Sequence, residues 1–231
     1  MAARQDLDVA LVVGSHGRHV LIETPEGRRL IAHPRGKKSA CVVGDRVRWQ
    51  PAGDEGVIEA IEPRRNLLMR QDEWRHKNFA ANIDQLLVVL AGEPMFSESQ
   101  LTRALIAAEE AGIPTTLLLN KTDVPQAAVA RERLAAYPGM GYTLLETALK
   151  TRPEAALATL GPVLAGRATL VLGASGMGKS TLINLVVPEA QAETQEVSQA
   201  LNSGKHTTTT TRWYWLASAA GSPREIGRAH V

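Results

Sequence analysis

The sequence predicts an α/β protein with a small N-terminal β-barrel followed by a doubly wound, mostly parallel sheet. Three observations lead to this fold class. Residues 7–63 contain five short strand patterns separated by turns with glycine and proline. From residue 83 onward, apolar strand patterns alternate with helix patterns, the order that builds a parallel sheet. A glycine-rich stretch at 173–181 joins one of these strands directly to a helix.

The first segment, bounded at residues 1–63, predicts an OB-like barrel, with an SH3-like barrel as the alternative. Its strand patterns lie at 9–13, 19–23, 28–32, 45–49 and 56–61. The part from 28 to 48 carries one acidic side chain, Asp45, and seven basic ones: Arg28, Arg29, Arg35, Lys37, Lys38, Arg46 and Arg48.

This basic bias favours contact with the phosphate backbone of RNA, because binding then releases counterions. A solvated basic loop is the alternative. Trp49 is the only aromatic residue of that part, so we expect recognition of folded RNA by shape and backbone rather than by base stacking.

The rest of the chain is expected to form a basic linker at 64–82, a nucleotide-binding domain at 83–216 and a tail at 217–231. Strand patterns lie at 83–91, 115–119, 142–145 and 168–172, and helix patterns separate them at 101–111, 126–137 and 153–164.

The glycine-rich stretch fits the phosphate-binding pattern G-x-x-x-x-G-K-[ST]. Its glycines let several backbone N–H groups point into one concavity, and the helix that follows adds its positive end. We expect Lys179 to reach the β- and γ-phosphates, Ser180 to bind Mg²⁺ and Thr181 to donate to the α-phosphate. A glycine-rich turn before an ordinary helix is the alternative. The candidate phosphate-binding residues are Gly173, Ala174, Ser175, Gly176, Met177, Gly178, Lys179, Ser180 and Thr181.

A second pattern predicts which base is bound. Asn120, Lys121, Thr122 and Asp123 follow a strand pattern and match N-K-x-D, a guanine-reading motif. The Asp123 carboxylate can accept hydrogen bonds from N1–H and the 2-amino group of guanine, whereas adenine would leave it unpaired. Thr147 and Ala148 occupy the place where a main-chain N–H would back the base, although this match is weaker.

The order of the two motifs predicts a circularly permuted GTPase domain. In ordinary GTPases the phosphate loop comes first, whereas here the base-reading motif precedes it. Further along stand five consecutive threonines at 207–211. Residues 207–209 are expected to form a switch loop, with a β-branched strand as the alternative, and residues 210–216 are expected to form a strand. Thr207, Thr208 and Thr209 are the candidate Mg²⁺ ligands of this loop, and Thr208 would also act in catalysis with Lys179 and His206, which could position the attacking water.

The composition is that of a soluble globular protein, with 231 residues, 44% hydrophobic residues and a formal net charge of +2. No apolar run is long enough to span a membrane, and no signal peptide is expected at the N-terminus. The single cysteine, Cys41, excludes intramolecular disulfides. We expect a cytoplasmic monomer that makes no contact with membranes.

The chain resembles the bacterial ribosome small-subunit-dependent GTPase family, RsgA (also called YjeQ). The segments that carry the resemblance are 44–47, 80–84, 120–123, 173–181 and 204–209, in the permuted order. The resemblance implies an OB domain, a permuted GTPase domain, GTP or GDP and Mg²⁺ as ligands, and the 30S subunit with its 16S rRNA as partner. It also implies slow GTP hydrolysis stimulated by the 30S subunit, with His206 in place of the usual switch glutamine.

The resemblance further implies an Asp-x-x-Gly switch motif and a C-terminal zinc domain, and the sequence departs from the family in both. No aspartate follows Asp123, and one cysteine cannot build a zinc site of several thiolates. We therefore expect a C-terminally truncated chain with an incomplete GTPase domain, an aberrant or artefactual tail at 217–231, no zinc ligands, and poor hydrolysis. The function expected is GTP hydrolysis in late 30S maturation. The alternatives are a P-loop ATPase or kinase, or a nucleotide-gated RNA-binding module without catalysis.

Overall fold

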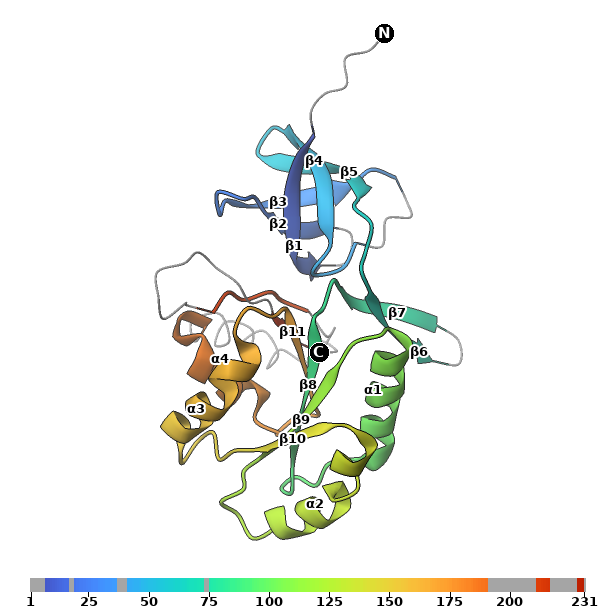
Figure 1. The fold of residues 1–231 in the computed structure, drawn as a ribbon. Helices are drawn as coiled ribbons and strands as arrows, with labels where there is room; N and C mark the ends of the chain where they lie inside the picture. The colour runs from blue at the N-terminus through green and yellow to red at the C-terminus, as the bar shows by residue number, and fades with distance from the viewer. Residues whose placement is uncertain are drawn as a thin grey trace, which may run out of the picture. The chain divides into compact units, whose positions relative to one another are not determined.

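The computed structural model describes residues 7–16, 19–36, 41–72, 75–190, 211–216 and 228–230. These residues form two compact units (Figure 1). The described residues up to 83, together with 211–213, make the first unit, and those from 84 to 190, with 214–216 and 228–230, make the second.

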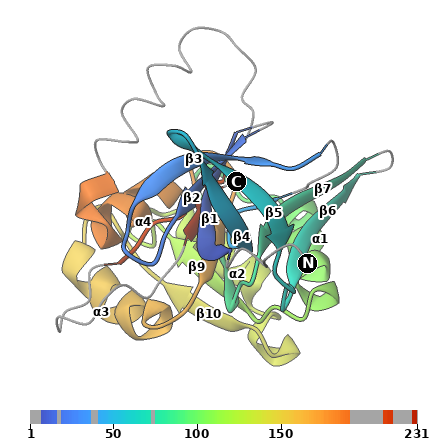
Figure 2. The same cartoon turned by 90° about the horizontal axis from the view of Figure 1, so that it is seen from above.

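The first unit contains a closed five-stranded barrel. Its strands are β1 (Asp8–His16), β2 (His19–Glu23), β3 (Arg29–Pro34), β4 (Arg46–Ala52) and β5 (Glu55–Ile61). They follow the order β1-β2-β3-β5-β4, and β4 closes the barrel by pairing with β1; Figure 2 looks down on the strands from above. Only β3 and β5 run parallel. The OB-like barrel predicted from the strand spacing is confirmed.

Apolar side chains at alternating strand positions fill the barrel, because successive residues of a strand face opposite sides of the sheet. Each of β3 and β4 alternates exposed with buried residues along its first four positions. The core residues are Ala10, Val12, Val20, Ile22, Leu30, Ala32, Cys41, Val47, Trp49 and Ile58.

A buried ion pair joins the barrel to the chain that leaves it. The carboxylate of Asp45 is fully buried, and Arg64 donates to it from Nε at 2.7 Å and from one terminal nitrogen at 2.8 Å. The backbone N–H of Val42 donates to the same carboxylate at 2.9 Å. The hydrogen bonds that Arg64 donates to Asp45 raise the pKa of its guanidinium above the ordinary value.

The segment expected to be a basic linker contains a β-hairpin of β6 (Leu67–Asp72) and β7 (Arg75–Ala81). The structure therefore differs here from a plain linker. Asn82 ends the hairpin in the left-handed region, with φ of 57°. Its side chain donates to the carbonyl of Gly44 and accepts from the N–H of Arg65, at 2.8 Å each. These contacts fix the end of the hairpin onto the barrel unit.

The second unit is a parallel sheet in the order β10-β9-β8-β11-β12. Figure 1 shows α1 and α2 on one face of this sheet and α3 and α4 on the other. The doubly wound sheet predicted from the sequence is confirmed. The elements are β8 (Gln85–Ala91), α1 (Glu98–Glu110), β9 (Thr115–Asn120), α2 (Ala127–Leu134), β10 (Thr143–Glu146), α3 (Pro153–Leu164), β11 (Thr169–Leu172), α4 (Lys179–Val186) and β12 (Arg228–His230), with short 3₁₀ turns at Pro138–Met140 and Pro188–Ala190.

All seven residues of β8 are buried, as expected for a strand covered by helices on both faces. At one edge of the sheet, β12 lies parallel to β11, with Thr169 opposite Arg228. Part of the segment expected to be an aberrant tail thus forms a strand. None of the described helices is both long enough and apolar enough to cross a membrane.

Candidate nucleotide site

Four loops meet where the parallel strands β8, β9, β10 and β11 end. Because these strands run in the same direction and neighbour one another, their carboxyl ends lie at one edge of the sheet. The phosphate loop follows β11, the base-reading loop follows β9, residues 147–149 follow β10, and residues 92–94 follow β8. Ligands of open α/β sheets bind at such an edge.

The phosphate loop depends on glycine at three positions. Gly173, Gly176 and Gly178 have φ of 154°, 81° and 103°. A Cβ atom at Gly173 would lie 2.5 Å from the carbonyl oxygen of Val89, and one at Gly176 would lie 3.2 Å from the ring of Pro94. The loop is therefore closely packed on its protein side, and a side chain at these positions would displace it.

The end of the loop leads directly into α4. Lys179 is the first residue of the helix, and its Nζ donates to the carbonyls of Gly173 and Ala174 at 2.6 and 2.9 Å. Ser180 and Thr181 are exposed at the N-terminal turn of the helix. Their hydroxyls therefore lie where the helix dipole favours an anion.

Asn120 links the base-reading loop to the phosphate loop. It is the last residue of β9 and is only 3% exposed. Its amide nitrogen donates to the carbonyl of Met177 at 2.9 Å, and its amide oxygen accepts from the N–H of Leu149 at 3.1 Å. The hydroxyl of Thr147 lies 3.5 Å from that same oxygen. One buried side chain therefore connects three of the four loops.

The next two residues of the base-reading loop are held from both sides. Lys121 has a left-handed backbone, with φ of 59°, and its Nζ donates to the carbonyl of Glu93 at 2.7 Å. Thr122 donates to the carbonyl of Thr147 at 3.1 Å from both its N–H and its hydroxyl. The loop is thus fixed to the turns after β8 and β10.

Asp123 is the exposed residue of this loop, as a side chain that reads a ligand must be. Its Oδ2 accepts a hydrogen bond of 2.9 Å from the hydroxyl of Thr151. Oδ1 has no hydrogen-bond partner among the described residues. The carboxylate can therefore accept from a base edge while Thr151 limits its rotation.

Four contributors to the site were missed by the sequence analysis: Glu93, Pro94, Leu149 and Thr151. Gly92-Glu93-Pro94 directly after an apolar strand was the available signal for the first two, since such a turn marks a carboxyl-end loop. Leu149 acts through its backbone and Thr151 through one hydroxyl, so neither carries a sequence signal. His206, Thr207, Thr208 and Thr209 lie outside the described residues.

The residues present fit a guanine nucleotide with Mg²⁺. The phosphate loop has glycine at the positions where a Cβ would meet neighbouring backbone or side chains, and it begins a helix with exposed hydroxyls. Phosphates and Mg²⁺ would be held by Lys179 and Ser180, and the base by Asp123, with Ala148 and Thr147 behind it.

Comparison with known proteins agrees with this geometry. A family model described as RsgA GTPase matches residues 61–221. The chain belongs to the RsgA GTPase family. It is 60% identical over 229 residues to the "Small ribosomal subunit biogenesis GTPase RsgA" of Variovorax paradoxus, with 96% of this chain and 72% of the relative covered. The protein of the same name from Paraburkholderia phymatum is 52% identical over 236 residues, with 98% and 74% covered.

Solved structures give the same assignment of fold. The crystal structure of YjeQ from Thermotoga maritima matches with a TM-score of 0.65 and 27% identity, covering 95% of this chain and 73% of that one. YloQ, described as a circularly permuted GTPase, matches with a TM-score of 0.57 and 23% identity, covering 82% and 67%. The family consists of GTP hydrolases, so the chain has the general ligands of a GTPase, a guanine nucleotide and Mg²⁺.

The barrel is less basic than its sequence suggests. Arg29 donates to Glu23 and Arg35 donates to Glu59, each at 2.6 Å. Arg48 pairs with a third carboxylate, Glu62, which raises the pKa of the guanidinium through their hydrogen bond. These carboxylates come from other strands or follow β5, so a count restricted to residues 28–48 omits them.

Two basic side chains of the barrel are not paired with a carboxylate of the described chain. Arg28 and Arg46 are exposed, and neither guanidinium contacts a carboxylate among the residues that the structure describes. Lys37 and Lys38 lie outside the described residues.

Proposed function

We propose that the chain binds GTP at the carboxyl edge of β8, β9, β10 and β11, hydrolyses it to GDP and phosphate, and acts in late maturation of the small ribosomal subunit. The observation that carries the nucleotide proposal is the position of Asn120. Its hydrogen bond to Met177 ties the base-reading loop to the phosphate loop, and the bond from Leu149 adds the loop after β10, so one edge presents both halves of a nucleotide site.

The two halves of the site bind different parts of the nucleotide. Asp123 accepts from N1–H and the 2-amino group of guanine, and Thr151 holds the carboxylate in place. The backbone N–H groups of the phosphate loop and the ammonium of Lys179 bind the phosphates. Lys179 exchanges its two loop carbonyls for phosphate oxygens, a stronger charge-assisted contact.

Hydrolysis at this site depends on positioning the attacking water and on neutralising the charge of the phosphate oxygens. A water oxygen attacks the γ-phosphorus in line, the bond from that phosphorus to the β–γ bridging oxygen breaks, and GDP and phosphate leave. Lys179 neutralises charge on the oxygens of the leaving group. Ser180 would hold Mg²⁺, which would supply further positive charge to these oxygens. Among the residues outside the structural description, His206 would position the water and Thr207, Thr208 or Thr209 would complete the metal site.

The ribosomal part of the proposal rests on the relatives, which are named small ribosomal subunit biogenesis GTPases. We infer that the chain associates with the 30S subunit as a cytoplasmic monomer and contacts 16S rRNA through its barrel. Arg28 and Arg46 are the best placed of its described basic side chains, since neither is engaged with a carboxylate.

The substitution Asp123→Asn tests the base assignment. An amide donates where the carboxylate accepted, so the preference should move from GDP toward xanthosine diphosphate. Fluorescent nucleotide titration measures both affinities. Asp54→Asn, at an exposed turn of the barrel, is the matched control and should change neither. Unchanged GDP affinity in Asp123→Asn, or ATP competing for the site as well as GTP does, would reject the assignment.

Phosphate release, measured with and without added 30S subunits, tests the remaining steps. We expect turnover to rise when 30S subunits are added. If nucleotide binds and no phosphate is released under either condition, the chain is a nucleotide-gated binding module instead.

A further inference from the structure

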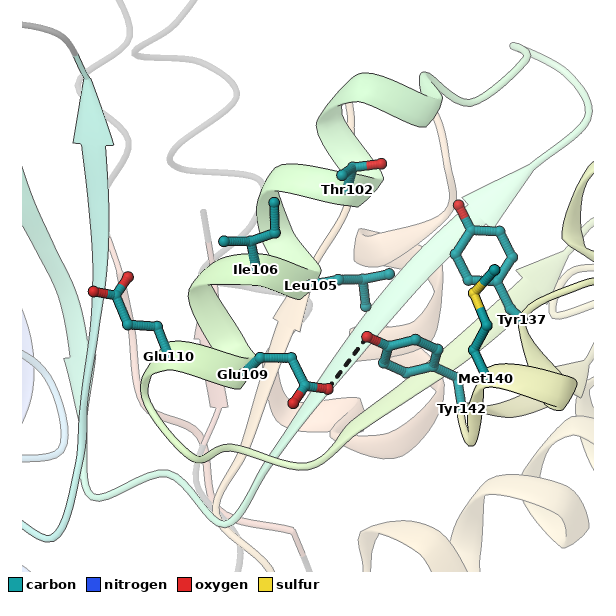
Figure 3. Close-up of a pocket in the computed structure, with 8 residues that line it drawn as sticks. All are labelled: Thr102, Leu105, Ile106, Glu109, Glu110, Tyr137, Met140 and Tyr142. Carbon is teal, nitrogen blue, oxygen red and sulfur yellow. Dashed lines mark hydrogen bonds between the residues drawn. The ribbon is translucent and has the colours of Figure 1, made fainter.

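A groove of about 690 Å³ lies in the second unit, lined by α1 and by the segment that follows α2. Figure 3 shows its lining residues along α1 and along the segment from Tyr137 to Tyr142. The helix contributes Thr102, Leu105, Ile106, Glu109 and Glu110, and the segment that follows α2 contributes Tyr137, Met140 and Tyr142. The helix positions are spaced three and four residues apart, so they share one face of α1.

Two of the apolar side chains that line the groove are highly exposed. Ile106 is 61% exposed and Met140 is 67% exposed, and these are the two most exposed large apolar side chains among the described residues. Both line the groove. Exposed apolar side chains that occur singly are ordinary, whereas these two line the same groove, so one partner side chain could cover both.

The charge of the groove is negative. Glu109 and Glu110 are exposed, and no lysine or arginine is among the lining residues. The hydroxyl of Tyr142 donates to Glu109 at 3.2 Å, and Figure 3 shows Glu110 at the end of the groove away from the tyrosines. Two carboxylates without a basic neighbour in the lining repel a phosphate backbone and attract a cation.

The tyrosines add a second feature that suits a cation. The rings of Tyr137 and Tyr142 lie 6.1 Å apart between centroids and are tilted by 54°. A lysine or arginine side chain can lie against the face of a tyrosine while its charge pairs with a carboxylate. Glu109, held beside Tyr142, supplies that carboxylate.

We propose that this groove binds a basic peptide segment of another protein, in which an apolar side chain is flanked by lysine or arginine. The apolar residue packs on Ile106 and Met140, and the cationic residues pair with Glu109 and Glu110. The stretch of α1 from Thr102 to Glu110 is about 12 Å long, which matches about four residues of extended chain. The inference is independent of the nucleotide site and goes beyond the proposed function.

Fluorescence anisotropy with a labelled synthetic peptide, leucines flanked by lysines and arginines, tests the proposal on the full chain. Ile106→Ser should weaken binding about fivefold, because the apolar contact is lost. Glu110→Lys should weaken it about threefold, as expected for an exposed charge pair. The matched controls are Val129→Ser and Glu132→Lys, exposed positions of α2 outside the lining, and they should leave binding unchanged.

Three further probes separate this occupant from others. An acidic peptide of the same length should not bind, and an oligouridine RNA, which the barrel is proposed to contact, should not displace the labelled basic peptide. The chain alone should sediment as a monomer over the concentrations used. The proposal is overturned if the groove variants bind the basic peptide as the parent chain does. It is also overturned if the RNA displaces the peptide. Self-association that Ile106→Ser abolishes would instead assign the groove to a second copy of the chain.

Discussion

The substitution Gly178→Ala tests the packing that joins the two nucleotide-binding loops. Gly178 precedes α4 with φ of 103° and ψ of 17°, in the left-handed region. A Cβ atom there would lie 2.2 Å from the amide nitrogen of Asn120. Asn120 is buried, so it cannot move aside without losing its hydrogen bonds to Met177 and Leu149.

The expected cost has two parts. A side chain in the left-handed region costs about 1–2 kcal/mol. The two buried hydrogen bonds of Asn120 are worth about 1 kcal/mol each, so their loss adds about 2 kcal/mol. We therefore expect the free energy of unfolding of the second unit to fall by about 3–4 kcal/mol. GDP affinity should fall about tenfold if one main-chain contact to phosphate, worth about 1.5 kcal/mol, is lost with the loop geometry.

Substitutions at two other glycines of the same unit separate the backbone cost from the cost of the lost hydrogen bonds. Gly112 has φ of 65° and open space around its Cβ position, so Gly112→Ala should cost only the backbone part, about 1–2 kcal/mol. Gly161 lies in α3 with no positive φ and directly precedes Pro162, whose ring crowds a Cβ on a helical residue, so Gly161→Ala should leave stability within about 0.5–1 kcal/mol of the parent chain.

Urea unfolding followed by the helical circular dichroism signal measures all three variants. The described helices α1 to α4 all belong to the second unit, so this signal reports that unit. The reasoning is refuted if Gly178→Ala loses no more stability than Gly112→Ala, or if it binds GDP as tightly as the parent chain.

Three further outcomes are expected. Asp45→Asn should destabilise the barrel unit by about 3 kcal/mol, because it breaks a buried ion pair, and urea unfolding followed by tryptophan fluorescence would show this. Burial and the hydrogen bond to Glu109 raise the pKa of Tyr142 in the folded protein. The stability that the neutral Tyr142 hydroxyl contributes is therefore present below its unfolded pKa of about 10 and is lost as pH rises through the folded pKa. Tyr142→Phe should reduce this loss of stability at alkaline pH, measured by unfolding across pH. Arg46→Ala should weaken 30S binding and lower its salt dependence more than Arg29→Ala does, because Arg29 is already paired with Glu23, and equal effects in a filter-binding assay would contradict this.

The sequence by itself determined the chemistry of the nucleotide site. The phosphate loop and the base-reading motif are continuous stretches, and each needs its residue types at fixed spacing, so both can be found without tertiary information. The apolar run of β8 and the spacing of the barrel strands predicted the parallel sheet and the OB-like barrel in the same way, because side-chain periodicity follows from local backbone geometry.

Only the tertiary structure decided which distant residues meet. Asn120 and Met177 are 57 residues apart in sequence and hydrogen-bonded in the fold, and Thr151 reaches Asp123 across 28 residues. The basic stretch of the barrel is partly neutralised for the same reason, since Arg35 meets Glu59 from 24 residues away. A sequence pattern records spacing along one element, whereas these contacts depend on how strands are ordered in a sheet, which periodicity does not encode.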